Sequence, residues 1–376
     1  MKKIPLIKPY INDTVRKMVT DVLDSGHLTE GRITHEFERI FADFIGVPYA
    51  LAVTSCTTGM EIALRALKIG PDDEVIIPDY TYPATADVVS IVGATPVIVD
   101  VEPRTMLIDR HSVEKAITEK TKAIIPVSIF GNPLDYSWIN EIKKKFNLFV
   151  IEDSACSIGA EINGQRVGSF ADISVFSLHP RKFITTGEGG LITTSDKNLF
   201  NWMNSYKHFG IGNLEAERGG ICFERIGTNY KLSDVLSAIG FAQMQSVDIL
   251  LADRRLQAER YKKLISGCDK LDIQATYEGA KHSYQTFTVF VENRDEVMRK
   301  MREIGIEVQI GTYAIHVHPA FNDYRRVAAN GSGILEGSLY AYKHALALPM
   351  FFGLEESDQE YVIEKLNGIC FSGVAK

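Results

Sequence analysis

The first part of the chain carries two helical patterns. Apolar residues recur at helical spacing over residues 15–22, and Asn12 and Asp13 before them are residue types that cap helices. The same spacing recurs over residues 37–45 and ends at Gly46. These patterns predict two amphipathic helices ahead of the first strand.

From residue 50 onward the pattern changes to short apolar runs, rich in β-branched residues and separated by helical segments. The runs cover residues 50–53, 75–77, 96–99, 123–127, 149–151, 173–176 and 191–193. Near-continuous apolar strands are typical of a parallel sheet that is buried on both faces. Their alternation with helices predicts a three-layer α/β/α domain built from right-handed crossovers.

The pattern changes again after a long helical stretch at residues 233–264. It predicts strands at 287–291 and near Val308, a charged helix at 294–304 and a terminal helix at 357–366. We therefore expect a large domain over residues 1–248, with the N-terminal segment included, and a small α+β domain over residues 249–376.

Composition and charge narrow the class of protein. The chain is 45% hydrophobic and 24% charged, and its net charge of −7 disfavours binding to nucleic acid or to an anionic membrane. The five scattered cysteines fit reduced thiols rather than a disulfide framework or a metal site. No signal-peptide pattern occurs, and no apolar run approaches the ~20 residues that span a bilayer. We expect a cytoplasmic protein without a bound metal.

Polar residues follow four of the predicted strands, where an open α/β sheet binds its ligands. They occupy positions 55–57, 79–82, 152–153 and 177–182. Neither of the glycine-rich strings that mark dinucleotide or nucleoside triphosphate sites is present. We expect the four groups to converge on one crevice.

Lys182 is the candidate for covalent chemistry, because it lies near a strand end and precedes a glycine-rich turn at residues 187–190. Burial and neighbouring cations would lower the pKa of the Lys182 amine, and the neutral amine could then attack a carbonyl carbon. Taken alone, Lys182 is better explained as an exposed lysine beside a structural turn than as a reactive amine.

The other candidates also allow two interpretations each. Asp153 could pair with a protonated pyridine nitrogen or cap a turn. The helix start at Cys56 and Thr57 could bind phosphate or carry an ordinary N-cap. Tyr82 could lie against a planar cofactor or fill a core position. His179 could be a catalytic acid or a structural histidine.

The order of these motifs resembles a known family. Residues 177–190 read SLHPRKFITTGEGG, and they are accompanied by matching segments at 26–31, 82–85, 152–155 and 227–234. Together they are similar to the DegT/DnrJ/EryC1/StrS sugar aminotransferases. These belong to the aspartate-aminotransferase-like, fold-type I enzymes that use pyridoxal 5′-phosphate (PLP). The resemblance covers nearly the whole chain.

The resemblance implies a set of site residues. The implied catalytic residues are Lys182, Asp153 and His179, and the implied cofactor-binding residues are Lys182, Asp153, Cys56, Thr57, Tyr82, Cys156, Ser177, Asn229 and Lys231. Lys182 would form the Schiff base, and Asp153 would pair with the pyridine nitrogen. Cys56, Thr57 and Ser177 would hold the phosphate.

The resemblance also implies a homodimer whose active sites are shared. Asn229 and Lys231 would reach the phosphate of the partner, and residues 208–227 are similar to a loop that crosses toward the partner. Two residues depart from the family pattern. Leu178 replaces the usual Phe, and Cys156 replaces the Gln or His beside the cofactor ring. A thiol cannot make the same hydrogen bond to the 3-oxygen of the cofactor.

The implied reaction moves an amino group from a donor, L-glutamate, to the cofactor, giving pyridoxamine phosphate, and then to a nucleotide-linked keto-deoxysugar. Residues 313–316 would help to shape the acceptor pocket. Related dehydratases carry His at the position of Lys182, and the lysine here argues for transamination. The alternatives are a keto-cyclitol aminotransferase and a non-catalytic PLP-binding regulator. A regulator would not need to keep both Lys182 and Asp153.

Overall fold

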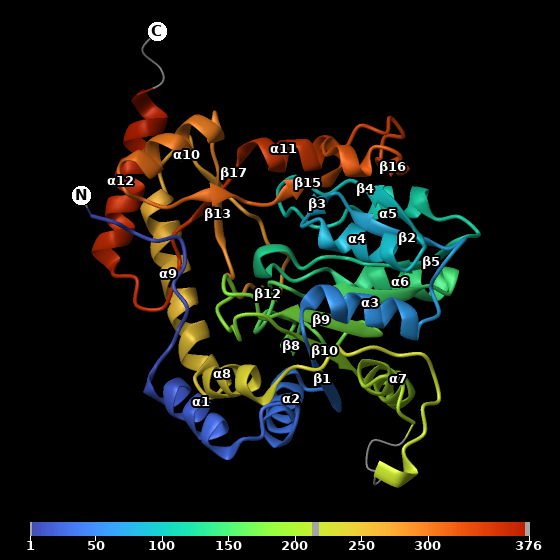
Figure 1. Cartoon of the computed structure of the whole chain (residues 1–376). Helices are drawn as coiled ribbons and strands as arrows, with labels where there is room; N and C mark the ends of the chain where they lie inside the picture. The colour runs from blue at the N-terminus through green and yellow to red at the C-terminus, as the bar shows by residue number, and fades with distance from the viewer. Residues whose placement is uncertain (1, 213–217, 373–376) are drawn as a thin grey trace.

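An eight-stranded sheet forms the centre of the larger part of the molecule (Figure 1). The computed structural model describes residues 2–212 and 218–372. In spatial order the strands are β1 (Tyr49–Val53), β10 (Gly190–Thr194), β9 (Ile173–Ser177), β6 (Phe149–Asp153), β5 (Thr121–Ile124), β2 (Glu74–Pro78), β4 (Thr95–Val99) and β16 (Arg326–Val327). Every predicted apolar run overlaps one of these strands, and the predicted fold class is confirmed.

Parallel pairing dominates this sheet from β9 to β16, but β10 runs antiparallel to both of its neighbours. The expectation of parallel strands throughout is therefore wrong for β10. The connection from β9 to β10, residues 178–189, contains no helix. A parallel neighbour requires a crossover, whereas this connection turns the chain back beside β9. Because the connection carries Lys182, the turn keeps that residue at the end of the sheet.

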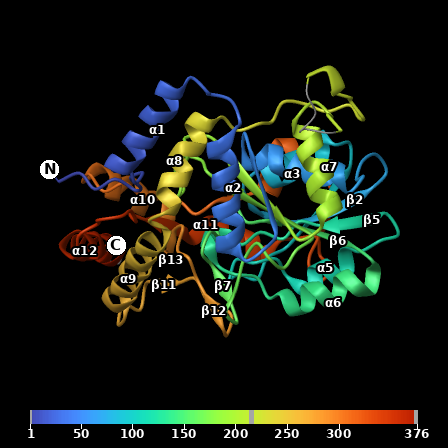
Figure 2. The same cartoon turned by 90° about the horizontal axis from the view of Figure 1, so that it is seen from below.

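Helices cover both faces of the sheet. One face is covered by α3 (Cys56–Ala66), α4 (Ala84–Ile91) and α7 (Lys197–Lys207), and the other by α2 (Arg32–Ile45), α5 (Arg110–Ala116), α6 (Tyr136–Phe146) and α8 (Asp234–Met244). In β2, Val75 and Ile77 pack in the apolar core beneath α3, α4 and α7, whereas Ile76 packs in the core beneath α5 and α6 on the other face. Figure 2 shows α3 and α7 on one side of β5 and β6, and α5 and α6 on the other.

The predicted long helix at 233–264 is two helices, α8 and α9 (Val247–Ile265), bent by 61°. The end of α8 packs with α2 against the large sheet, while the later turns of α9 pack in the core of the C-terminal unit. Two separate cores therefore explain the bend. Among the described residues no single helix is long and apolar enough to span a membrane, and only α8 and α9 taken together pass that test.

The C-terminal unit is a four-stranded sheet with helices packed against it. Its strands are β11 (Asp272–Ile273), β13 (Phe287–Phe290), β17 (Ala345–Leu348) and β14 (Gln309–Ile310), and its helices are α9, α10 (Arg294–Glu303) and α12 (Glu356–Ser372). Further helices and short strands are α1 (Asp13–Ser25), β3 (Tyr80–Thr81), β7 (Glu161–Ile162), β8 (Gln165–Arg166), β12 (Ala280–Lys281), β15 (Tyr313–Ala314) and α11 (Glu336–His344).

The chain passes between the two units more than once. Ile4 pairs with Ile306 of the C-terminal unit, while β16 joins the large sheet and β15 pairs with β3. The division at residue 248 stays a prediction. Residues 213–217, within the segment expected to cross toward a partner, lie outside the described residues.

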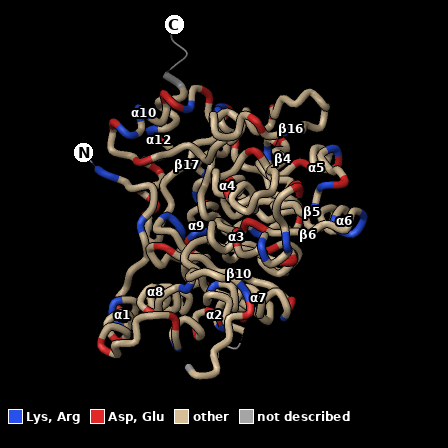
Figure 3. Tube along the Cα trace, turned by 45° about the vertical axis from the view of Figure 1, so that its right-hand side comes forward, with Lys and Arg blue, Asp and Glu red and all other residues tan. Residues whose placement is uncertain are grey.

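Charged residues of both signs occur along outer helices such as α5 and α10 (Figure 3). In α10, Arg299 pairs with Glu303 at 2.5 Å and Lys300 with Glu296 at 2.8 Å. Exposed pairs of this kind contribute little to stability, because water and salt screen the attraction between the charges. The buried apolar clusters therefore dominate the stability of the fold.

Candidate active site

A cavity of about 600 Å³ lies at the carboxyl ends of the strands of the large sheet. The sequence-predicted residues that line it are Cys56, Thr57, Tyr82, Asp153, Cys156, Ser177, His179 and Lys182. Residues 309–313 and 347–348 of the C-terminal unit close another side. A depression of about 790 Å³ at Phe149 and Asp172 contains none of these residues and lies at the opposite ends of the strands. The expected convergence on one crevice is therefore observed.

Asn229 and Lys231 do not line this cavity. Lys231 Nζ donates a hydrogen bond to Asn229 Oδ1 at 2.5 Å, and Asn229 forms a bridge with His208 at the end of α7. Burial lowers the pKa of Lys231. Any contact of these two residues with a cofactor must therefore be made elsewhere than in their own chain's cavity.

The first turn of α3 faces the cavity with free hydrogen-bond donors. Ser55 caps the helix, since its side chain accepts from Thr58 N at 3.1 Å. The amides of Cys56 and Thr57 come first in the helix, where an N–H has no intrahelical acceptor. A Cβ at Gly190 would lie 2.6 Å from the carbonyl carbon of Ser55, so only glycine lets β10 approach this turn. Free amides at a helix start form an anion site.

Asp153 is buried at the end of β6 and is held on both oxygens. Thr85 Oγ1 donates to Oδ2 at 2.9 Å, and the Ala155 amide donates to Oδ1 at 3.1 Å. Burial raises the pKa of Asp153, although Thr85, Ala155 and Lys182 favour its charged form. A cationic ligand group beside Asp153 would offset this cost of burial, as a protonated pyridine nitrogen does.

The neighbouring carboxylate of Glu152 points to the other face of the strand, as successive residues of a strand do. Its oxygens accept hydrogen bonds from Ser128 at 2.5 Å, from Tyr136, and from Ser174 at 3.4 Å. Burial raises the pKa of Glu152. Glu152 is therefore a structural carboxyl, and Asp153 is the one that faces the cavity.

The amine of Lys182 lies against sulfur rather than against a cation. Its Nζ donates to Cys156 Sγ at 3.0 Å. Burial lowers the pKa of Lys182, but Cys156, Cys56 and Asp153 outweigh burial and the net pKa is raised. The expected lowering is therefore wrong for this arrangement. It assumed neighbouring cations, whereas the groups that face the amine are thiols and a carboxyl.

A buried glutamine clamps the backbone on both sides of Lys182. Gln285 Nε2 donates to the carbonyl oxygen of Arg181 at 2.7 Å, and the amide of Phe183 donates to Gln285 Oε1 at 3.1 Å. Arg254, buried under this loop, donates to the carbonyl oxygen of Gln285 at 3.1 Å. The side chain of Gln285 thereby pairs with the loop as a neighbouring strand would.

A second glutamine clamps the same loop farther along. The amide of Thr185 donates to Gln243 Oε1 at 3.0 Å, and Gln243 Nε2 donates to the carbonyl oxygen of Thr185 at 2.8 Å. Sequence reasoning missed both glutamines, and no motif marks them. Gln243 lies 58 positions from Thr185 in the sequence, and Gln285 lies 102 positions from Phe183.

His179 and Tyr82 lie at the mouth of the cavity. His179 Nδ1 accepts from the amide of Arg181 at 3.2 Å, and burial lowers the pKa of His179. This contact favours a structural role for the ring. Tyr82 is 64% exposed, and its ring packs edge-on against Tyr313 of β15 with 6.1 Å between centroids.

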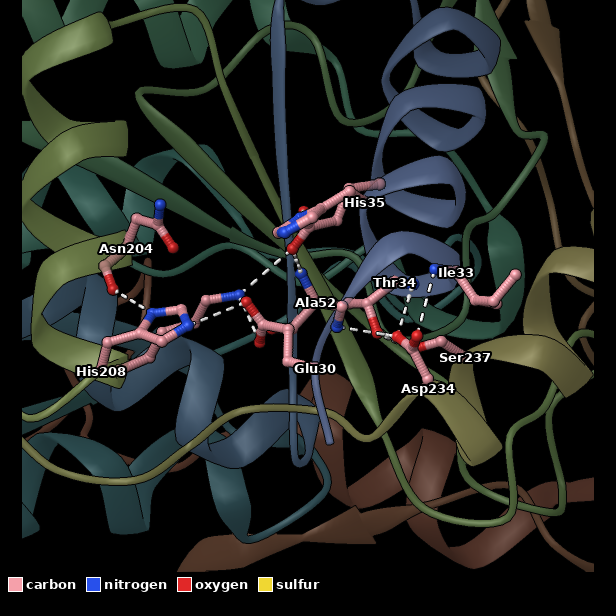
Figure 4. Close-up of polar contacts among 12 residues, drawn as sticks. Glu30, Ile33, Thr34, His35, Ala52, Asn204, His208, Asp234 and Ser237 are labelled. Carbon is pink, nitrogen blue, oxygen red and sulfur yellow. Dashed lines mark hydrogen bonds and ion pairs between the residues drawn. The ribbon is translucent and has the colours of Figure 1, made fainter. Parts of the chain in front are cut away.

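A separate ion cluster lies between α2, the end of α7 and the loop before α2 (Figure 4). Glu30, His35 and Glu38 bring possible metal ligands within 4.8 Å of one another. The buried ammonium of Lys207 already lies 3.0 Å from Glu30 and 3.2 Å from Glu38. His208 lies 3.0 Å from Glu30. The Lys207 ammonium therefore pairs with both carboxylates of this cluster and anchors the loop that carries Glu30.

The donors in the cavity fit PLP. Amides and hydroxyls at the start of α3 and at Ser177 suit a phosphate, Asp153 suits a pyridinium nitrogen, and Lys182 supplies a primary amine between them.

Comparison with known proteins gives the same result. The sequence matches the DegT/DnrJ/EryC1/StrS aminotransferase family over residues 9–367. GDP-perosamine synthase of Caulobacter vibrioides is 35% identical over 98% of this chain and 99% of that protein. GDP-perosamine synthase of Escherichia coli O157:H7 is 33% identical over 98% of each. The PLP form of Spr1654 from Streptococcus pneumoniae has a TM-score of 0.91 and 27% identity over the whole of both chains. The chain belongs to the DegT/DnrJ/EryC1/StrS family and is a PLP-dependent sugar aminotransferase.

Proposed function

We propose that the enzyme transfers the amino group of L-glutamate to the keto group of a GDP-linked deoxysugar. The observation that carries this proposal is the cavity, in which Lys182, Asp153 and the start of α3 face one another. The two relatives named GDP-perosamine synthase favour GDP as the nucleotide. The acceptor would be the sugar that has a keto oxygen where GDP-perosamine has its amino nitrogen.

The residues of the site have separate tasks in this proposal. PLP, when bound, supplies an electron sink that lets an amino group pass between two carbonyl carbons. The amides of Cys56 and Thr57 and the hydroxyl of Ser177 bind the phosphate. Asp153 keeps the pyridine nitrogen protonated, with Thr85 orienting the carboxylate. Lys182 Nζ would hold the cofactor, and its free amine would serve as the base that takes up and returns a proton during transamination.

The proposal includes a homodimer with shared sites. Asn229 and Lys231 lie outside the cavity of their own chain, on the segment that links α7 to α8. On that segment Phe223 is 64% exposed and Ile226 is 94% exposed. Large apolar side chains exposed to this degree suit burial against a second copy of the chain. The partner's Asn229 would then complete the phosphate site.

A substrate panel tests the proposed reaction. Purified enzyme is incubated with L-glutamate and, in separate reactions, with keto sugars linked to GDP, UDP or dTDP and with a keto-cyclitol that carries no nucleotide. We expect 2-oxoglutarate and an aminated product with the GDP-linked sugar, and neither product with Lys182→Ala. Amination of the cyclitol alone would establish the rival function. Amination with other donors but not with glutamate would refute the donor.

A further inference from the structure

The thiol of Cys156 and the amine of Lys182 form a contact pair inside the open cavity. Nζ lies 3.0 Å from Sγ, and both residues line the cavity. Cys156 is only partly buried, so small solutes in the cavity can reach its sulfur. A Gln or His at this position, as the family usually has, could not undergo sulfur oxidation.

We propose that Cys156 and Lys182 are a peroxide-sensitive pair, in which oxidation joins Sγ to Nζ by a sulfur–nitrogen bond and thereby removes the amine that holds the cofactor. This inference concerns the regulation of the site and extends the proposed function. The bond itself depends only on the contact between the two side chains.

The chemistry balances with hydrogen peroxide as the oxidant. The thiolate of Cys156 attacks one peroxide oxygen, which gives a sulfenic acid and hydroxide. Hydroxide takes a proton from the Lys182 ammonium and becomes water. The neutral amine then attacks the sulfenic sulfur, forms the S–N bond and releases a second water. In sum, thiolate, ammonium and peroxide give the S–N link and two waters, and sulfur is oxidised while peroxide is reduced.

The other cysteine of the cavity is a matched control. Cys56 is buried, and its sulfur donates to the carbonyl oxygen of Val175 at 3.6 Å. Burial raises the pKa of the Cys56 thiol well above its usual value, which disfavours the reactive thiolate. Cys222 is exposed and reports that peroxide has reached the protein.

The state of Lys182 governs the reaction. With the cofactor held on Nζ, Lys182 would offer no free primary amine to attack sulfur. When an amino donor takes its place, or when the cofactor is removed, Nζ is free beside Cys156. We therefore expect peroxide to form the link in the donor-treated and cofactor-free enzyme, and the PLP-loaded enzyme to be protected.

Mass spectrometry tests the proposal on three samples treated with hydrogen peroxide: PLP-loaded enzyme, the same enzyme with excess L-glutamate, and enzyme freed of cofactor. The expected result is a loss of about 2 Da in the latter two, the mass of two hydrogens. Peptide mapping should find residues 156 and 182 joined, and dithiothreitol should restore both. A link in the cofactor-free sample alone supports the pair and shows that glutamate is not the donor.

Variants complete the test. Cys56→Ser should still form the link, and Cys156→Ser should not. In Lys182→Ala the sulfenic acid should persist and react with dimedone, which identifies the intermediate even if Cys156→Ser fails to fold. The proposal is overturned if Cys156 of the cofactor-free wild-type enzyme passes to sulfinic acid while Lys182 stays free.

Discussion

Replacing Gln285 with Met should weaken catalysis more than it weakens the fold. The change keeps the side-chain volume and removes both hydrogen bonds to the Lys182 loop. It leaves the buried amide of Phe183 unpaired, which costs about 1–3 kcal/mol, and the partly exposed carbonyl of Arg181, which costs less. Because both groups flank Lys182, its Nζ loses its fixed position. A displacement of about 1 Å can reduce turnover about 100-fold.

Gln243→Met is the matched control, because it removes the same pair of bonds from Thr185 on the same loop. Both of these bonds are buried, so we expect a larger loss of stability, about 2–6 kcal/mol. Urea denaturation gives the free energy of unfolding of each variant, and steady-state assays below the unfolding transition give kcat. We therefore expect the larger loss of kcat in Gln285→Met and the larger loss of unfolding free energy in Gln243→Met. An equal or larger loss of kcat in Gln243→Met would refute the positioning role of Gln285.

Three further predictions concern pH and assembly. Burial lowers the pKa of His282 to about 3, so the unfolded chain takes up a proton at a higher pH than the folded protein does. The free energy of unfolding should therefore fall by up to about 1.4 kcal/mol per pH unit as the pH drops from about 6.5 toward 3. Thermal unfolding of His282→Gln should lack this trend, and identical pH profiles would contradict it. Burial raises the pKa of Asp153, so the cofactor-free protein should lose stability as pH rises through that raised pKa, and Asp153→Asn should not. The prediction is contradicted if the melting temperature of the wild type rises relative to that of Asp153→Asn as the pH increases. Lys182→Ala and Asn229→Ala should each be inactive, whereas an equal mixture should recover about a quarter of the wild-type sites, since half of the dimers are mixed and each has one intact site. No recovery after mixing would exclude a shared site.

The strands of the large sheet are predictable because burial on both faces leaves a local mark. In β2, Val75, Ile76 and Ile77 are all fully buried, on alternating faces. The direction of β10 leaves no such mark, since an apolar run looks the same in either orientation. Its direction depends on the connection at 178–189. The bend between α8 and α9 is equally hidden, because helical spacing continues across it while the core that each helix faces changes.

The candidate site was predictable as far as topology brings strand ends together. Residues that follow β1, β2, β6 and β9 meet at the cavity for that reason alone. The pKa of Lys182 was not predictable, because its direction depends on which side chains face the amine. Gln243, Gln285 and Thr85 act on partners 58, 102 and 68 positions away, and only the folded chain brings them together.

Borohydride reduction tests most directly the claim that Lys182 carries the cofactor. The PLP-loaded enzyme is reduced with borohydride, digested, and mapped by mass spectrometry, with and without prior addition of L-glutamate. We expect the phosphopyridoxyl group on Lys182 and on no other lysine, and we expect glutamate to suppress it, because the donor displaces Nζ from the cofactor. Labelling of a different lysine, or labelling of Lys182 that glutamate does not reduce, would contradict the account.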